Sequence, residues 1–314
     1  NPRAGNETTL VLPPSRLKKT VAVVGGGVAG LAAASAAAER GLQVTLFEAR
    51  DSLGGQFDMA MLIPGKEEFV GTLHFYEGEL KRHGVEVKLG AHVQAADLQH
   101  FDEVIVATGV QPRIPNIKGV ELPNVVTYAQ VIRGERRVGN EVAILGAGGI
   151  GFDTAEFLTQ HGASIALDKE KFKKSWGVVM DTQTRGNVVA PQLEQSRRKV
   201  TMLQRKSTKA GAGLGLTTGW IHRAEVERRG VVTIVGVNYE EITPKGVHIT
   251  VEGQPRFISA DTIVLCTGQE SLTDLYDELK ALGINAHLIG GAKLASELDA
   301  KRAIYEGVEV AATF

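Results

Sequence analysis

The chain has 314 residues with 35 Lys and Arg against 36 Asp and Glu, which gives a formal net charge of −1. This length predicts two domains with real apolar cores, and the balanced charge gives no reason to expect nucleic acid or an acidic surface as a partner. A single cysteine, Cys266, excludes an internal disulfide framework, a four-cysteine zinc site and a CxxC redox pair. We predict no metal site.

Residues 20–38 form the longest uncharged stretch, but successive glycines and many alanines favour a strand, turn and helix over a membrane span. Residues 1–20 hold no apolar core of the signal-peptide type. A cytoplasmic protein that makes no contact with a membrane is therefore expected. Residues 1–19 show no periodicity and contain Pro13-Pro14, so they are predicted to be an arm or linker.

The first motif is TVAVVGGGVAG, residues 20–30. It predicts a strand over 20–24, then a glycine-rich turn and an Ala-rich helix over 28–40, which is the order of a dinucleotide-binding unit. Gly25 would permit the tight turn, Gly27 would let a pyrophosphate approach the backbone, and Gly30 would let helix and strand pack closely. The helix N-terminus would attract the phosphates.

A second strand is expected over 42–47, and Glu48 follows it, where a carboxylate can accept hydrogen bonds from a ribose diol. The loop containing Gly54-Gly55-Gln56 suits close contact with a bulky ligand. Residues 64–69 are predicted to begin a helix that runs to Arg82. Lys66 could contact the ligand or be a solvated lysine, and the two alternatives carry equal weight.

Further strands are expected over 85–89 and 101–109, with residues 91–93 following the first of them. The second ends in Ala107, Thr108 and Gly109, which are small enough to pass close to a bound dinucleotide. Residues 110–117 contain two prolines and are predicted to be a crossover connection.

The motif recurs at residues 140–151, NEVAILGAGGIG, with Gly146, Gly148 and Gly151 before a helix over 149–160. This is an internal repeat of one supersecondary unit. Two such units imply two dinucleotides, and a protein that holds two dinucleotides is expected to move a hydride from one to the other.

The acid that would bind the second ribose can be placed in two ways. A regular unit would put its next strand at 163–167 and make Asp168 the ribose acid, which suits NAD. The alternative skips a loop and uses KVTMLQ, residues 199–204, so that Arg205 and Lys206 stand there and suit the 2′-phosphate of NADP. We favour the second, because KVTMLQ is longer and more β-like; a solvated basic patch is the other interpretation of the pair.

Residues 209–223 are glycine-rich and then amphipathic, so this loop could close over a cofactor, with Thr217, Thr218 and Gly219 capping a helix near Trp220. Residues 231–237, Ile242 and 247–251 are predicted to form a small antiparallel ribbon. Residues 260–268 repeat the strand that ends in Thr-Gly, and Cys266 inside it is expected to be a core residue. Residues 287–291 are a predicted strand, and 297–309 a helix whose N-terminus could stabilise negative charge on a flavin.

These residues resemble a known family. The paired motifs, LGGQF, VIVATG, KEEF, LQRK followed by GLGLTTGWIHR, and IGG with ELDAKRAI resemble the C-terminal half of the bacterial 2,4-dienoyl-CoA reductases, over nearly the whole chain. The old yellow enzyme-like relatives, such as trimethylamine dehydrogenase, share this half. The resemblance implies a partner barrel that carries FMN, a 4Fe–4S cluster, and a half similar to this chain that binds FAD and NADPH.

By that resemblance, Gln56, Lys66 and Val93 join the first glycines and Glu48 as FAD contacts, and Arg205 and Lys206 match the NADP phosphate position. No barrel and no cluster cysteines occur in this sequence, so we expect a fragment of a longer protein and place FMN and 4Fe–4S only in a missing N-terminal part. No catalytic side chain is predicted, because the first step requires alignment only. The full set of predicted cofactor-binding residues is Gly25, Gly27, Val28, Ala29, Gly30, Glu48, Ala49, Gly55, Gln56, Lys66, Val93, Ala107, Thr108, Gly109, Gly146, Gly148, Gly149, Ile150, Gly151, Arg205, Lys206, Thr218, Gly219, Gly268, Gly291 and Asp299.

The predicted fold is α/β, with two Rossmann-like, three-layer ββα domains, one inserted in the other. The FAD-binding domain would comprise 20–117 and 268–314, and the NAD(P)H-binding domain 118–267. A pyridine nucleotide–disulfide reductase has the same fold, but the lack of a cysteine pair argues against that activity. A non-catalytic scaffold that binds ADP or FAD is the alternative from another class.

Overall fold

The computed structural model describes residues 3–296 and 299–314, so the predicted helix start at 297–298 lies outside the described residues, as do residues 1–2. The chain divides into two compact units. The first comprises Asn1–Met61, Glu68–Gln111 and Gln269–Phe314, and the second comprises Leu62–Glu67 and Pro112–Gly268. The predicted boundaries fell after residues 117 and 267. The strands β5 (Val110–Pro112) and β14 (Gln269–Ser271) pair where the chain passes between the units.

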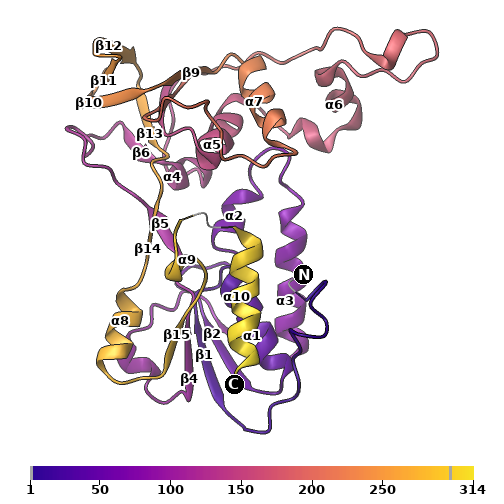
Figure 1. Cartoon of the computed structure of the whole chain (residues 1–314), viewed down its shortest axis with the longest axis vertical. Coiled ribbons are helices and arrows are strands. Elements are labelled where there is room, and N and C mark those ends of the chain that lie inside the picture. Colours follow the sequence, from indigo (N-terminus) through magenta and orange to yellow (C-terminus); the bar gives the residue numbers. More distant parts are fainter. Residues whose placement is uncertain (1–2, 297–298) are drawn as a thin grey trace. The chain divides into compact units, whose positions relative to one another are not determined.

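The first unit is built on a five-stranded parallel sheet in the order β15-β4-β1-β2-β3 (Figure 1). Its central strands are buried on both faces, and their near-continuous apolar runs follow from that burial. The strands are β1 (Thr20–Val24), β2 (Gln43–Phe47), β3 (Glu86–Lys88), β4 (Glu103–Val106) and β15 (Ala286–Leu288).

Helices cover both faces of this sheet. One core joins the sheet to α1 (Val28–Glu39), α3 (Phe69–Arg82) and α10 (Ala300–Ala312), and the other joins it to η1 (Ala95–Leu98) and α8 (Asp274–Ala281). Figure 1 shows α1 and α10 side by side. Their contact is close because small residues face each other: a Cβ on Gly307 would lie 2.4 Å from the carbonyl oxygen of Ala29. The remaining helices of this unit are α2 (Gln56–Ala60) and α9 (Gly290–Lys293).

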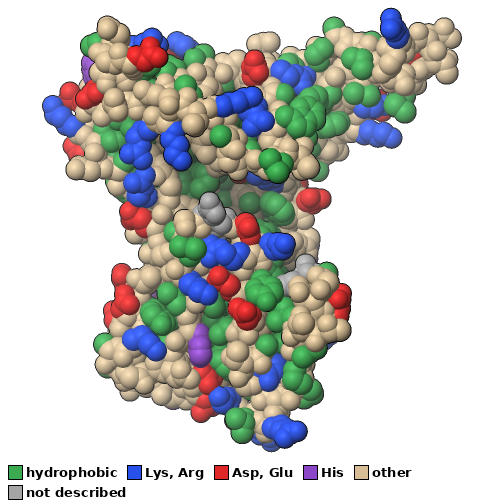
Figure 2. Space-filling view, viewed as in Figure 1, with side chains coloured by type: hydrophobic (Ala, Val, Ile, Leu, Met, Phe, Trp, Pro, Cys, Tyr) green, Lys and Arg blue, Asp and Glu red, His purple; other side chains and the backbone are tan. Residues whose placement is uncertain are grey.

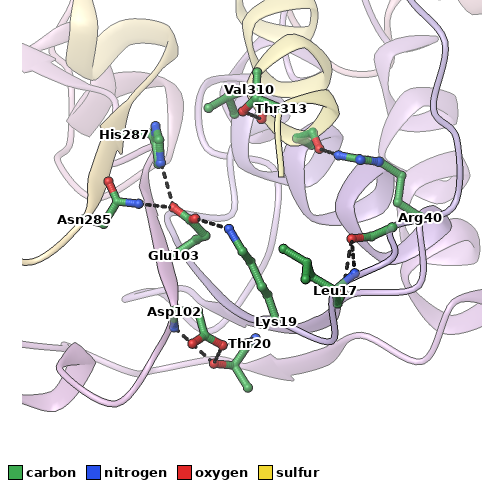
Figure 3. Close-up of polar contacts among 12 residues, drawn as sticks. Leu17, Lys19, Thr20, Arg40, Asp102, Glu103, Asn285, His287, Val310 and Thr313 are labelled. Carbon is green, nitrogen blue, oxygen red and sulfur yellow. Dashed lines mark hydrogen bonds and ion pairs between the residues drawn. The ribbon is translucent and has the colours of Figure 1, made fainter.

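A buried acid joins the amino ends of three strands in this unit. Glu103, at the start of β4, is 5% exposed and accepts hydrogen bonds from Lys19 Nζ (2.6 Å), Asn285 Nδ2 (2.5 Å) and His287 Nε2 (2.9 Å) (Figure 3). Burial opposes its ionisation, but the bonds and charges of Lys19 and His287 outweigh burial and lower the pKa of Glu103. The cluster therefore stabilises the sheet through one carboxylate.

The N-terminal segment predicted to be an arm or linker packs onto the first unit. Leu10 is buried in the core beside α1, and Arg3 forms a bidentate ion pair with Glu39 (3.0 and 3.1 Å). The predicted helix start at 64–69 is wrong, because α3 begins only at Phe69, and Glu67 and Glu68 lie before the helix. Residues 91–93 form no strand.

The second unit repeats the parallel sheet, in the order β6-β13-β7-β8-β9, with α5 (Gly149–Thr159) against one face. An antiparallel ribbon of three strands packs on the other face and completes a three-layer ββα domain. The strands are β6 (Val125–Thr127), β7 (Glu141–Leu145), β8 (Lys199–Gln204), β9 (Val232–Val235) and β13 (Thr262–Leu265), with β10 (Val237–Thr243), β11 (Gly246–Val251) and β12 (Gln254–Ser259) in the ribbon. The prediction that residues 231–235 belong to the ribbon was wrong, because β9 pairs with β8.

Residues 160–198 form an insertion between α5 and β8. It contains η2 (Ile165–Leu167), α6 (Lys169–Trp176) and η3 (Arg185–Asn187), and it extends from the second unit in Figure 1. Several of its large hydrophobic side chains are exposed, and green side chains lie along it in Figure 2. Trp176 anchors the insertion, because its ring packs edge-on against Trp220 at 6.0 Å and lies under the guanidinium of Arg228 at 4.5 Å. The unit also contains α4 (Tyr128–Ile132) and α7 (Gly219–Arg228).

Candidate nucleotide-binding sites

The first glycine turn leaves no room for side chains at two of its three glycines. A Cβ on Gly25 would lie 2.3 Å from the Ala107 carbonyl oxygen, and Gly25 has φ +110°. A Cβ on Gly30 would lie 1.9 Å from the Gly25 carbonyl oxygen. Gly25 therefore makes the tight turn and Gly30 the close helix contact, as their spacing predicted.

Gly27 differs, because the nearest atom to a Cβ there would be the Gly55 Cα at 3.9 Å, so the backbone at the start of α1 is open to a ligand. Glu48 stands at the same turn: one carboxylate oxygen accepts the Gly26 N–H (2.6 Å) and the other accepts the Arg50 N–H (2.9 Å). Each oxygen keeps acceptor capacity for a ribose hydroxyl. An open helix N-terminus beside a fixed carboxylate fits an adenosine diphosphate group such as that of FAD.

Several other predicted residues of the first unit make internal hydrogen bonds. Thr108 Oγ1 donates to the Leu272 carbonyl (2.7 Å), and Gln56 Oε1 accepts from Gln269 Nε2 (3.3 Å). Asp299 caps α10 by accepting the Arg302 N–H (2.6 Å), so this helix begins at Ala300. The remaining predicted residues of this unit are Val28 and Ala29 in the first turn of α1, Ala49 after Glu48, Gly55 before α2, Val93 between β3 and η1, Ala107 and Gly109 after β4, and Gly291 in α9.

The helix predicted over 297–309 is present as α10, which begins at Ala300, and its stabilisation of negative charge on a flavin stays a prediction. The helix that follows β15 is α9, which has only four residues, and the N–H of its first residue, Gly290, donates to Glu306 Oε2 at 2.6 Å. A carboxylate of α10 therefore satisfies one N–H group at the start of α9.

The second turn has the geometry of the first. Gly146 has φ +117° and its Cβ would lie 2.1 Å from the Cys266 carbonyl oxygen, while a Cβ on Gly151 would lie 2.1 Å from the Gly146 carbonyl oxygen. No atom of the described residues outside the immediate chain neighbours lies within 4 Å of the position of a Cβ on Gly148. The second turn is thus also open at the middle glycine, and Gly149 and Ile150 begin α5 beside it.

The structure decides which of the two candidate segments is the strand. Residues 199–204 form β8, which pairs with β7, and Arg205 and Lys206 follow it directly. Residues 165–167 form a 3-10 helix, and Asp168 caps α6 by accepting the Glu170 and Lys171 N–H groups (3.0 and 3.1 Å). The alternative prediction of a strand over 163–167 was therefore wrong, while the residues that bind the ribose group stay a prediction.

A cavity of about 360 Å³ lies at this turn. Among the described residues that line it are Gly148, Arg205, Lys206 and Arg113, and the lining contains three cationic side chains and no acidic one. An anionic ligand is the chemical complement of such a lining. Sequence reasoning missed Arg113, which lay in a segment interpreted only as a crossover; its place beside Pro112 carried no signal for a ligand.

The glycine-rich loop before α7 also differs from its prediction. Thr218 occupies the N-cap position, but its side chain makes no capping hydrogen bond. Gly219 is required for packing, since a Cβ there would lie 2.7 Å from Leu214 Cβ. Gly268 has φ +107° and lies beside Arg113.

Lys66 belongs to the second unit, where its Nζ pairs with Asp153 at 2.6 Å. One helical turn along α5, His222 Nδ1 of α7 pairs with Glu156 at 2.7 Å. That hydrogen bond raises the pKa of His222, and burial raises the pKa of Glu156. Both pairs tie other segments to the helix that follows the second turn.

The two turns define a protein with two dinucleotide sites, an oxidoreductase domain of the kind that uses FAD and NAD(P)H. The chain belongs to the pyridine nucleotide-disulphide oxidoreductase family, which matches residues 19–299. It is 34% identical over 301 residues to an NADH oxidase of Thermoanaerobacter brockii, covering 93% of this chain and 41% of the relative. It is 29% identical over 318 residues to a cinnamate reductase of Clostridium sporogenes, covering 99% and 42%.

Among solved structures, a 2-naphthoyl-CoA reductase complex has a TM-score of 0.84 at 24% identity, covering 100% of this chain and 43% of that one, so the fold is shared. The chain spans less than half the length of these relatives. Within residues 3–296 and 299–314, no helix is both long and apolar enough to cross a bilayer.

Proposed function

We propose that this chain is an NADPH-dependent flavoprotein module in which the first unit binds FAD and the second binds NADPH. The observation that carries the proposal is the pair of cations, Arg205 and Lys206, directly after β8 and in the lining of the cavity at the second glycine turn. An acid at that position would favour NAD, whereas two cations favour the additional phosphate of NADP.

The bound cofactors supply the chemistry, which is transfer of a hydride from NADPH to FAD. The residues of this chain hold and align them. Gly27 and Gly148 leave the backbone open for the phosphates, Glu48 binds a ribose of FAD, and Arg205 and Lys206 bind the 2′-phosphate. No side chain has to move a proton in this step.

We further propose that the module delivers electrons to a barrel with FMN and a 4Fe–4S cluster, and that the whole protein reduces a 2,4-dienoyl-CoA. The motif resemblance supports this substrate, as does the similarity to a cinnamate reductase and to a 2-naphthoyl-CoA reductase. The barrel would hold the substrate, because no residue of this chain is assigned to it.

The test of the module is stopped-flow bleaching of the flavin with NADPH and then with NADH. Replacing both cations, Arg205→Ala with Lys206→Ala, should weaken NADPH by about 100-fold or more, since hydrogen bonds to charged groups contribute about 1.5–3 kcal/mol each, and should leave NADH within about twofold. The control is Lys199→Ala, at the other end of β8, where the side chain is 69% exposed.

Equal losses for NADPH and NADH would contradict the 2′-phosphate assignment. A chain that retains flavin but is reduced by neither nucleotide would contradict the module and favour a nucleotide-binding scaffold. A chain that retains no flavin would contradict the FAD assignment to the first unit.

A further inference from the structure

Hydrogen bonds fix the side chain of Arg113 at the end of β13, the strand beside β7 and the second glycine turn. Its Nε (2.9 Å) and Nη2 both donate to the carbonyl oxygen of Thr267, just after β13. Thr267 Oγ1 donates back to the Arg113 carbonyl (2.8 Å), and the Arg113 N–H donates to the Gly268 carbonyl (3.0 Å). The guanidinium is therefore held in one orientation before any ligand arrives.

These hydrogen bonds do not neutralise the positive charge of Arg113, so it can still attract an anionic ligand. Its partners are backbone carbonyls, and across the described parts of the chain no carboxylate pairs with it. A guanidinium has five N–H donors, so Nη1 keeps both of its own for a ligand. The side chain lines the cavity at the glycine turn, where none of the described lining residues is acidic.

Arg113 and the pair Arg205–Lys206 lie on opposite sides of the turn. In the sheet, β13 lies on one side of β7 and β8 lies on the other. Arg113 donates to the carbonyl of Thr267, just after β13, whereas Arg205 directly follows β8. The open backbone of Gly148, at the end of β7, lies between them in the same cavity lining. The lining thus offers cationic groups at two separate places, which suits a ligand with two separate anionic groups.

We infer that Arg113 binds the pyrophosphate of the nicotinamide cofactor, a role that rests on the proposed function of this site. The 2′-phosphate can occupy only one of the two places, and Arg205 with Lys206 hold the place after β8 where the ribose group lies. The diphosphate lies at the glycine turn and is common to NADP⁺ and NAD⁺. A fixed guanidinium is suited to two parallel bonds to phosphate oxygens.

The test is calorimetric binding of NADP⁺, NAD⁺ and adenosine 2′-monophosphate to the flavin-loaded chain. Arg113→Gln should weaken NADP⁺ and NAD⁺ alike, by about 10- to 30-fold, because it removes charged hydrogen bonds to a group that both contain. It should leave adenosine 2′-monophosphate, which lacks the diphosphate, within about twofold. Arg113→Lys keeps the charge and should recover part of the loss.

Arg136→Gln is the matched control, because the Nη2 of Arg136 also donates to a backbone carbonyl, that of Pro123 at 2.7 Å, on the exposed surface. Trp176 and Trp220 both lie in the second unit, so tryptophan fluorescence reports whether the variant unit is folded. Unchanged binding of NAD⁺ by Arg113→Gln would overturn the inference. Loss of all three ligands together with a lower melting midpoint would also overturn it, since that indicates a structural role. Failure of the unmodified chain to bind NADP⁺ and NAD⁺ would instead refute the proposed function, and the inference with it.

Discussion

Replacing Glu103 with Gln tests whether one buried carboxylate stabilises the first unit. Its Oε1 accepts from Lys19, and its Oε2 accepts from both Asn285 and His287. A glutamine keeps the shape but turns one acceptor into an NH₂ group, so at least one of these donors would face another donor. The variant therefore removes the charge and breaks the hydrogen-bond pattern without creating a cavity.

The expected loss follows from burial. Removing one partner of a fully buried ion pair costs about 3–5 kcal/mol. The side chains of Lys19 and His287 are 27% and 30% exposed, so water can solvate them in part. We expect a loss of about 2–3 kcal/mol for the first unit, which corresponds to a fall in its melting midpoint of roughly 4–12 °C.

The assay has to report the first unit alone. Both tryptophans lie in the second unit, so their fluorescence is insensitive to this loss, and hydrogen exchange of the amides of β4, read by mass spectrometry, is the suitable measurement. The control is Glu86→Gln in the same sheet, whose side chain is 61% exposed. Protection of β4 in Glu103→Gln equal to that in the control would refute this reasoning.

The same carboxylate gives a pH dependence. Because the folded pKa of Glu103 lies below its ordinary value, its stabilisation is complete above about pH 4.3, the value expected in the unfolded chain, and is lost as the pH falls through the lowered value. The unmodified chain should therefore lose β4 protection more steeply in acid than Glu103→Gln does.

The remaining predictions concern the glycines, the thiol and the half-buried His222. Compared in their flavin-free forms, Gly27→Ala should keep the melting midpoint of the unmodified chain, whereas Gly30→Ala should lower it, because only the second Cβ meets backbone, at 1.9 Å. Gly27→Ala should nevertheless bind flavin more weakly; equal midpoints of the two flavin-free variants would count against this distinction. Cys266, whose pKa burial raises to about 12, should not react with a thiol reagent at pH 8 until the chain unfolds, and rapid native labelling would contradict its burial. His222 should titrate above its ordinary value of about 6.5 in NMR spectra and return toward it in Glu156→Gln. Its contribution to stability is then complete below about pH 6.5 and lost as the pH rises through the raised value; an unshifted titration would exclude the pair as the cause.

The sequence predicted the features that depend on contacts close in the chain. The glycines of both turns, the helices that follow them and β8 could be located because each turn allows only certain residue types, and because KVTMLQ has a clear β pattern. Glu48 could be placed at the first turn because it directly follows a strand. The clear β pattern of KVTMLQ also favoured Arg205 over Asp168 as the residue that follows the second strand of the repeated unit.

Features that depend on distant partners were missed. The residues of β9, VTIV, do not show by themselves whether this strand pairs with β8 or joins the antiparallel ribbon. The acceptor of the Gly290 N–H is Glu306, which belongs to another helix. Lys66 has an acid partner on α5, and Arg113 is oriented by the carbonyl of Thr267. Each of these contacts is set by the tertiary fold, which local periodicity does not contain.

The close packing of α1 against α10 has a consequence for synthesis on the ribosome. Ala29 and Ala33 of α1 meet Gly307, which is translated only after the whole of the second unit, whose last segment ends at Gly268. The second unit can therefore complete its fold while the first still exposes the apolar face of α1. Until α10 emerges, that face stays exposed, and a pause in translation within the second unit would prolong the exposure.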